Sequence, residues 1–166
     1  VNNQGLKYKF NIDSAATSRE EIGNPPHYGT VNKLRQEGIP VLKHRAIQMT
    51  KQDYKEYDYI IGMDAWNIRN IMRIIGSDPE KKVSMLLDYT DRPGTEIADP
   101  WYTGNFDATY DDVLEGCTGL LEHLKNTEAF LNKNIIEEKT RKSKIQKSFG
   151  FSLFTMGFLK DFCFVS

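Results

Sequence analysis

The apolar positions of the chain repeat with two periods, one typical of strands and the other of helices. Residues 7–13 (KYKFNID) alternate polar and apolar side chains, which predicts a strand that runs into a turn of small residues at 14–18. The short apolar run at 57–64 predicts a buried strand, and residues 81–89 predict another. Three strands are therefore expected, and each leads into a loop.

Helical spacing of apolar residues fills the stretches between and after these strands. Residues 23–39 begin with prolines, and residues 65–75 stop at Gly76, so both segments predict helices. A long helix is predicted from about residue 107, with five residues on one apolar face: Val113, Cys117, Leu120, Leu121 and Leu124. Strands that alternate with helices predict an open parallel α/β sheet, in which ligands bind outside the carboxyl ends of the strands.

The composition changes after about residue 126. The chain becomes polar and increasingly basic, and its last 18 residues then hold most of its phenylalanines. We therefore expect one folded domain at 1–126 and a tail of unknown role at 127–166. A basic run before an aromatic segment could lie on a membrane surface. An appended tail, partly disordered or prone to association, is the favoured interpretation because the apolar run is short.

Composition narrows the function further. A net charge of −1 argues against a nucleic-acid-binding protein, which needs an excess of Lys and Arg. Two distant cysteines, Cys117 and Cys163, predict neither a disulfide framework nor a zinc site, so a reducing, cytoplasmic setting is expected. No run is long and apolar enough to predict a membrane span. The first residue, Val1, suggests a missing front end.

The stretch TEIADPWYTGNF at residues 95–106 raises the question of chemistry. Asp99 precedes Pro100, and Asp-Pro commonly opens a turn because proline fixes its own φ and keeps the preceding residue out of the helical region. On spacing alone, a turn residue is favoured over a proton donor.

Five separated blocks change this interpretation. They are NIDSAATS, IGNPPHYGT, GIPVLKHRAIQMT, YDYIIGMDAWNIRNI and IADPWYTGNFDATYDDVLEGC. In order and spacing they resemble the low-molecular-weight protein tyrosine phosphatases over residues 1 to about 126. The resemblance implies an α/β fold with an open four-stranded parallel sheet and flanking helices, and a hydrolase that needs no metal or cofactor.

The resemblance also implies a mechanism. In the family, the cysteine of a Cys-x5-Arg loop attacks the phosphorus of phosphotyrosine, while the backbone N–H groups and the arginine of that loop hold the phosphate oxygens. Asp99 matches the aspartate that protonates the leaving tyrosyl oxygen and then accepts a proton from water. Trp101 and Tyr102 match the aromatic walls of the slot. The expected partner is a phosphotyrosine protein or a small aryl phosphate.

Four further residues match supporting positions of the family. Ser14 matches a serine that supports the phosphate loop, and His44 matches a histidine that orients it, although one residue is inserted shortly before His44. Asp64 matches an aspartate at a strand end near the active site, where it would also suit a helix N-cap. Glu20 lies in the loop that rims the slot. Cys117, on an apolar helix face, is expected to belong to the core.

One departure from the family is decisive for activity. No Cys-x5-Arg occurs in these 166 residues, since Cys117 is followed six positions on by His123 and Cys163 has only three residues after it. The first strand of the family and its phosphate loop are therefore expected to be missing, which leaves a slot in the sheet and predicts poor folding. As a second account, the apolar segment 158–165 could occupy that slot without restoring the chemistry.

Three functions remain open at this stage. The first is a cytoplasmic phosphotyrosine phosphatase, here without its nucleophile and inactive alone. The second is a non-catalytic remnant that binds phosphorylated or aromatic ligands through Asp99, Trp101 and Tyr102. The third is an arsenate reductase of the same superfold, which would need additional redox cysteines. The sequence does not determine the oligomeric state.

Overall fold

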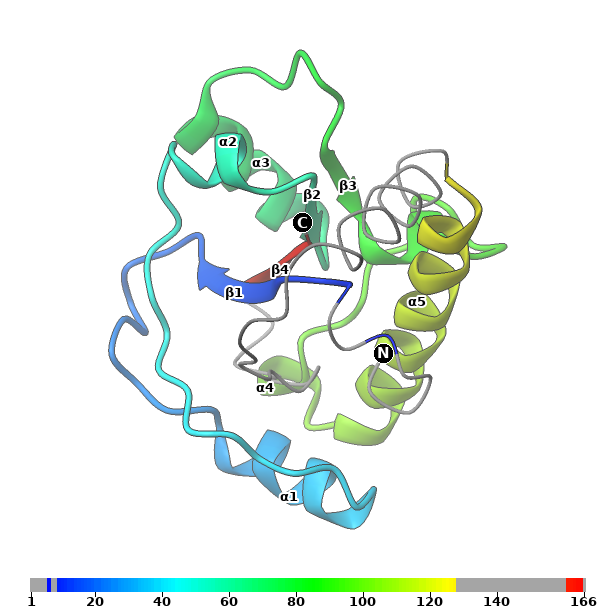
Figure 1. Ribbon diagram of the computed structural model, residues 1–166. Helices are drawn as coiled ribbons and strands as arrows, with labels where there is room; N and C mark the ends of the chain where they lie inside the picture. The colour runs from blue at the N-terminus through cyan, green and yellow to red at the C-terminus, as the bar shows by residue number, and fades with distance from the viewer. Residues whose placement is uncertain (1–5, 7–8, 128–160, 166) are drawn as a thin grey trace, which may run out of the picture.

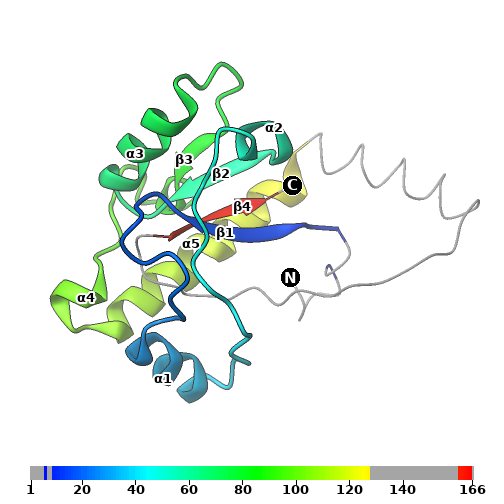
Figure 2. The same cartoon turned by 90° about the vertical axis from the view of Figure 1, so that its left-hand side faces the viewer.

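The protein is built around a four-stranded sheet with helices on both faces (Figures 1 and 2). A computed structural model describes residues 6, 9–127 and 161–165. The sheet has the order β1-β4-β2-β3, and its strands are β1 (Ile12–Ala16), β2 (Tyr59–Gly62), β3 (Val83–Met85) and β4 (Asp161–Val165). The expected α/β class is confirmed.

Strand β2 shows how alternation builds the two layers. Its neighbours Ile60 and Ile61 are both fully buried, yet they belong to different apolar clusters because successive strand residues point to opposite faces. Ile60 packs with Ile71 and Ile75 of helix α3 (Ala65–Ile75). Ile61 packs in the cluster that contains the buried residues of helix α5 (Phe106–Asn126). The run at 57–64 thus contains a buried strand, as predicted, although the strand is limited to Tyr59–Gly62.

The periodic helices lie where the sequence predicts them. Helix α3 spans Ala65–Ile75 and ends at Gly76, whose φ of 86° is one that glycine adopts without strain. Helix α1 (Tyr28–Gln36) covers part of the predicted segment 23–39. Helix α5 buries the predicted residues Val113, Leu120 and Leu124. Two short helices, α2 (Asp53–Glu56) and α4 (Pro100–Thr103), lie in the connections.

Two strands differ from the prediction in extent. Strand β1 begins at Ile12 and includes Ser14, Ala15 and Ala16, which were assigned to a turn. It forms where β4 pairs with it, so the sheet partner and not the preceding alternation sets its bounds. Strand β3 has only three residues, because the chain then enters a 3₁₀ helix, η2 (Leu86–Tyr89), whose start is fixed by the Asp88 carboxylate accepting the Met85 N–H at 2.8 Å.

Strand β4 confirms the hypothesis that the tail fills the slot, and it corrects the expectation of an all-parallel sheet. It runs antiparallel to both β1 and β2, with Cys163 opposite Ser14 on one side and Ile61 on the other. The strands from residues 12–85 are parallel to one another, as expected, but the inserted strand enters from the other end of the chain and runs in the opposite direction. The predictions for residues 128–160 lie outside the described residues.

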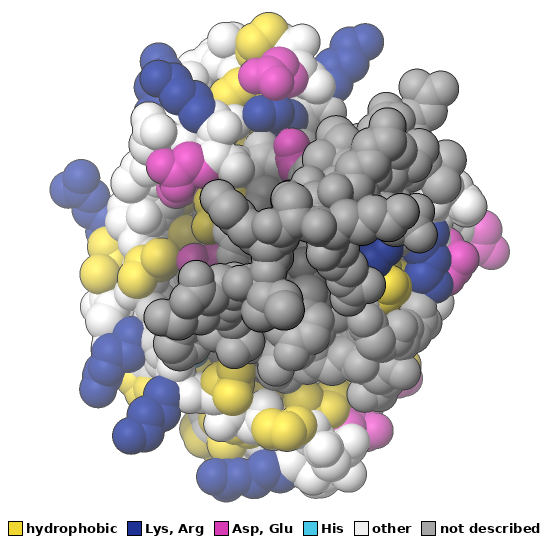
Figure 3. Space-filling view, viewed as in Figure 1, with side chains coloured by type: hydrophobic (Ala, Val, Ile, Leu, Met, Phe, Trp, Pro, Cys, Tyr) yellow, Lys and Arg dark blue, Asp and Glu magenta, His cyan; other side chains and the backbone are white. Residues whose placement is uncertain are grey.

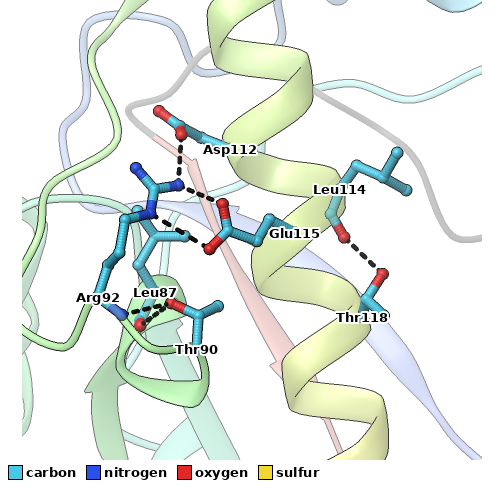
Figure 4. Close-up of polar contacts among 7 residues, drawn as sticks. All are labelled: Leu87, Thr90, Arg92, Asp112, Leu114, Glu115 and Thr118. Carbon is cyan, nitrogen blue, oxygen red and sulfur yellow. Dashed lines mark hydrogen bonds and ion pairs between the residues drawn. The ribbon is translucent and has the colours of Figure 1, made fainter.

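An ion cluster fastens helix α5 to the loop after η2 (Figure 4). The Arg92 guanidinium donates to Asp112 at 2.7 Å and through two nitrogens to Glu115, both on α5. The helix approaches η2 so closely that a Cβ added at Gly119 would overlap the Tyr89 backbone. This fit holds the start of the long loop that leads to Asp99.

The pairing of β4 with two neighbours predicts a large effect of proline at its centre. Cys163→Pro removes a backbone N–H and fixes φ in a central strand, where proline is not tolerated. We expect the free energy of unfolding to fall by about 2 kcal/mol or more, given about 1–3 kcal/mol for each buried group left unpaired. Urea unfolding followed by circular dichroism measures this loss.

The matched control is Cys163→Val, which changes the same side chain but keeps the N–H group and the strand propensity. Its unfolding midpoint should stay near that of the unmodified chain. Equal midpoints for the proline and valine variants would contradict the pairing of β4.

Candidate active site

Asp99 is both a turn residue and a positioned carboxylate. It is the N-cap of α4, and its Oδ1 atom accepts the Trp101 N–H at 2.8 Å. Pro100 occupies the first position of the helix, where its lack of an N–H costs nothing. Helix α4 ends at Gly104, which has a φ of 69°. The role of Asp99 in the turn is therefore compatible with a role in proton transfer.

Three hydrogen bonds fix the segment around Asp99. The Ile97 N–H donates to the Met63 carbonyl at 2.9 Å, next to the end of β2. The Glu96 carboxylate accepts the Ala65 N–H at 3.1 Å. From α5, the Thr109 hydroxyl donates to the Ala98 carbonyl at 2.9 Å. Asp99 is thus held at the carboxyl end of β2, the edge where ligands bind in parallel sheets.

An aromatic cluster borders this loop. The His27 ring stacks on Phe106 with centroids 5.5 Å apart and planes 2° apart, and its edge meets Trp101 at 5.0 Å. Trp101 and Tyr102 are exposed, at 55% and 77%. Figure 2 shows why these rings meet, because α4 lies beside the start of α5 and near α1.

Sequence reasoning missed His27 and Phe106. They are separated by 79 positions, and no periodicity within one element can pair residues from two elements. The one local signal is Gly29, where an added Cβ would overlap the Phe106 ring. A small residue at the start of a helix indicates a close neighbour but does not identify it.

Ser14 and His44 lie together, as their matched positions suggested. The Ser14 hydroxyl and His44 Nε2 are 3.1 Å apart, and Ser14 is 8% exposed. His44 lies in the irregular segment 39–47, and the contact forms although the two residues are 30 positions apart. Their role in supporting a phosphate loop stays a prediction.

Asp64 caps helix α3 and lies near the other acids of the site. Its Oδ1 atom accepts the Asn67 N–H at 2.6 Å. Burial raises the pKa of Asp64, and the carboxylates of Glu96 and Asp99 raise it further, although the N–H groups of Asn67 and Trp66 oppose the shift. Asp64 is thus an N-cap, and its role in the site stays a prediction.

Glu20 and Cys117 complete the predicted set. Glu20 is exposed in the turn after β1, where its role at the rim stays a prediction. Cys117 packs against the α5 cluster, and burial raises the pKa of its thiol to about 11. A thiol that stays protonated at neutral pH is a poor nucleophile, so the assignment of Cys117 to the core agrees with its surroundings.

In the part of the chain that the structure describes, no group of three His, Cys, Asp or Glu side chains could hold a metal ion. In those same residues, no helix has both the length and the apolar character to cross a membrane. The described features define an α/β protein with polar and aromatic loops at the carboxyl edge of its sheet.

Comparison with known proteins gives the family. The family model for "Low molecular weight phosphotyrosine protein phosphatase" matches residues 1–130. The low molecular weight protein-tyrosine-phosphatase YfkJ of Bacillus subtilis is 40% identical over 123 residues, which cover 74% of this chain and 79% of that protein. The human low molecular weight phosphotyrosine protein phosphatase is 35% identical over 126 residues, with the same coverage. The chain belongs to the low molecular weight phosphotyrosine protein phosphatase family.

Solved structures agree. The crystal structure of YfkJ from Bacillus subtilis matches with a TM-score of 0.72 at 38% identity, covering 76% of this chain and 80% of that one. That of SP-PTP, a low molecular weight protein tyrosine phosphatase from Streptococcus pyogenes, matches with a TM-score of 0.60 at 33% identity, covering 71% and 75%. The fold implied by the five sequence blocks is confirmed.

The raised pKa of Asp64 predicts a stabilising substitution. Because the folded state binds this proton more tightly than the unfolded state, the chain loses stability as pH rises from the ordinary pKa of aspartate, about 4, through the raised folded pKa. Asp64→Asn keeps the cap without the charge. It should raise the free energy of unfolding at pH 7, and the gain should vanish near pH 3.5 in urea unfolding.

Asp78→Asn is the control, because the pKa of Asp78 is shifted in the opposite direction from that of Asp64. Burial alone would raise the pKa of Asp78, but N–H groups of Lys82 and Val83 and the Tyr54 hydroxyl outweigh burial and lower it. Its carboxylate stabilises the fold above the ordinary pKa, and that contribution disappears as pH falls through the folded pKa. Asp78→Asn should therefore cost stability at pH 7, and a shared sign for the two variants would refute the interpretation.

Proposed function

We propose that Asp99 is the general acid and base of phosphotyrosine hydrolysis. It would protonate the tyrosyl oxygen as that group leaves, and then accept a proton from the water that attacks the phosphocysteine. The main support is its geometry. Asp99 Oδ1 is engaged by the Trp101 N–H, which orients the carboxylate, and Oδ2 has no partner among the described residues. One oxygen is thus fixed and the other is available to a substrate.

The substrate class follows from the rings beside this carboxylate. Trp101 and Tyr102 are largely exposed next to Asp99, and the His27 edge supports Trp101. Such rings can wall a slot for a phosphotyrosine side chain of a protein, or for a small aryl phosphate, because aromatic pairs stack with favourable geometry. The names of the relatives support phosphotyrosine as the substrate. Two distant cysteines support a cytoplasmic setting.

The nucleophilic segment of the family is missing from this sequence. The 166 residues contain no Cys-x5-Arg segment, and the pKa of Cys117, about 11, makes its thiol unsuited to attack. Cys163 lies within β4, opposite Ser14 and Ile61. We therefore propose that this chain binds phosphorylated aromatic ligands but does not turn them over by itself. A Cys-x5-Arg segment would have to complete the site.

Binding is tested with benzylphosphonate, an aromatic phosphonate that is not hydrolysed because a P–C bond replaces the ester linkage of an aryl phosphate. Trp101→Ala should weaken binding about tenfold in calorimetric titration, which corresponds to about 1.4 kcal/mol of lost aromatic contact. Leu114→Ala is the control, because Leu114 is an exposed apolar residue, at 44%, but lies on α5 and belongs to no proposed binding surface. Equal losses in the two variants would refute the proposed slot.

Catalysis is tested with phenyl phosphate, whose leaving group needs a proton. We expect the 166-residue chain to give no more phosphate than a protein-free blank, since it lacks the thiolate. Turnover well above the blank would overturn the proposed inactivity. Any such turnover should fall about 10²–10⁴-fold in Asp99→Asn if Asp99 is the acid. Glu96→Gln is the control, since Glu96 lies near Asp64 but is given no proton to transfer.

A further inference from the structure

An exposed aromatic and two arginines share one face of α3. Trp66, Arg69 and Arg73 are spaced three and four residues apart, so they follow one another along the helix surface. The Arg69 Cζ atom lies 5.1 Å from the centroid of the Trp66 ring, and the Arg73 Cζ atom lies 5.9 Å from it. These three residues form the α3 surface discussed below. In the view of Figure 3, Lys and Arg side chains stand at several separate points of the margin, some of them on the left, the side on which α2 and α3 lie in Figure 1.

The charge of this surface is not compensated within the described part of the chain. Neither Arg69 nor Arg73 has a carboxylate within ion-pair distance there, and Arg73 donates only to the amide oxygen of Asn70, at 3.3 Å. Arg92, in contrast, contacts two carboxylates. Two like charges four residues apart on a helix repel each other. An external anion would remove that cost.

The Trp66 ring holds both guanidinium groups in place and leaves their N–H groups able to bind an anion. A guanidinium over an indole ring is held by the ring quadrupole and loses little of its hydrogen-bonding capacity, because its N–H groups lie on its edge. That edge matches the two oxygens of a carboxylate. Two guanidinium groups therefore bind carboxylates better than the strongly hydrated ammonium group of a single lysine would.

The α3 surface begins at the edge of the candidate active site. Trp66 is two residues beyond Asp64, and the Ala65 N–H donates to Glu96, three residues before Asp99. Farther along the helix, the Asn70 amide donates to the Thr17 hydroxyl after β1, at 3.5 Å. The α3 surface therefore adjoins Asp64 and the segment that leads to Asp99.

We propose that the α3 surface binds an acidic segment next to the phosphotyrosine of a protein substrate. The occupant is chosen by charge complementarity, and the proposal rests on the function given above. Four residues of helix rise about 6 Å between Arg69 and Arg73, which equals about two residues of an extended peptide. Two carboxylates two or three positions apart would therefore reach both arginines.

The test uses unphosphorylated peptides, so that it does not depend on the phosphotyrosine slot. A fluorescein-labelled peptide with four glutamates and its four-glutamine counterpart are titrated with the 166-residue chain, and anisotropy reports binding. We expect the glutamate peptide to bind at least fivefold more tightly. Arg69→Gln with Arg73→Gln should weaken its binding about fivefold, the size expected for two exposed ion pairs, and higher salt should weaken it as well.

Arg35→Gln is the matched control, because Arg35 is an exposed arginine on α1. It should leave binding unchanged, and circular dichroism should give all variants the same unfolding midpoint. The proposal fails if the double variant binds as the unmodified chain does, if the glutamine peptide binds equally well, or if vesicles of anionic lipid displace the peptide completely. Loss of benzylphosphonate binding in Trp101→Ala concerns the slot alone, so the two proposals can fail independently.

Discussion

The pairing of β4 with β1 and β2 is the constraint on which the rest of the structure depends. Strands β1 and β2 both direct backbone N–H and C=O groups toward the space between them, and buried groups of this kind must be paired. Strand β4 pairs with five residues of β1 and three of β2. It thereby sets the spacing of the two strands that carry Ser14 and lead to Asp64. The direction of the inserted strand is secondary, because antiparallel pairing satisfies the same groups.

Once the strands are fixed, two hydrogen bonds hold the loop that contains Asp99 against the sheet and helix α5. The Ile97 N–H donates to the carbonyl of Met63, the residue directly after β2. From α5, the Thr109 hydroxyl donates to the carbonyl of Ala98 in the same loop. Asp99 directly follows these two attachments, at Ile97 and Ala98, so it is held through them from the sheet and from the helix layer. A turn residue becomes a positioned acid through this double attachment, which no local pattern contains.

The sequence predictions were accurate for features that depend on neighbouring residues and inaccurate for features that depend on contacts between distant segments. Helix α3 was predicted with its end at Gly76, because helix periodicity and a glycine stop are local features. Strand β1 was misplaced, since alternation shows that a segment can be a strand but not which of its residues has a partner. The family blocks located Asp99, but not the support that Trp101 receives from His27 and Phe106.

The sequence by itself determined the fold class, the family and the positions of the longer helices, and it singled out the acidic and aromatic residues that are proposed for the site. These depend on periodicity, on turn chemistry and on the order of short motifs, all of which are written along the chain. Only the tertiary structure decided that residues 161–165 lie inside the sheet, that Ser14 meets His44, and that Trp66 joins two arginines at the edge of the site. Strand pairing and side-chain contacts form between segments whose separation along the chain carries no information about their distance in space, and burial of their polar groups selects the arrangement.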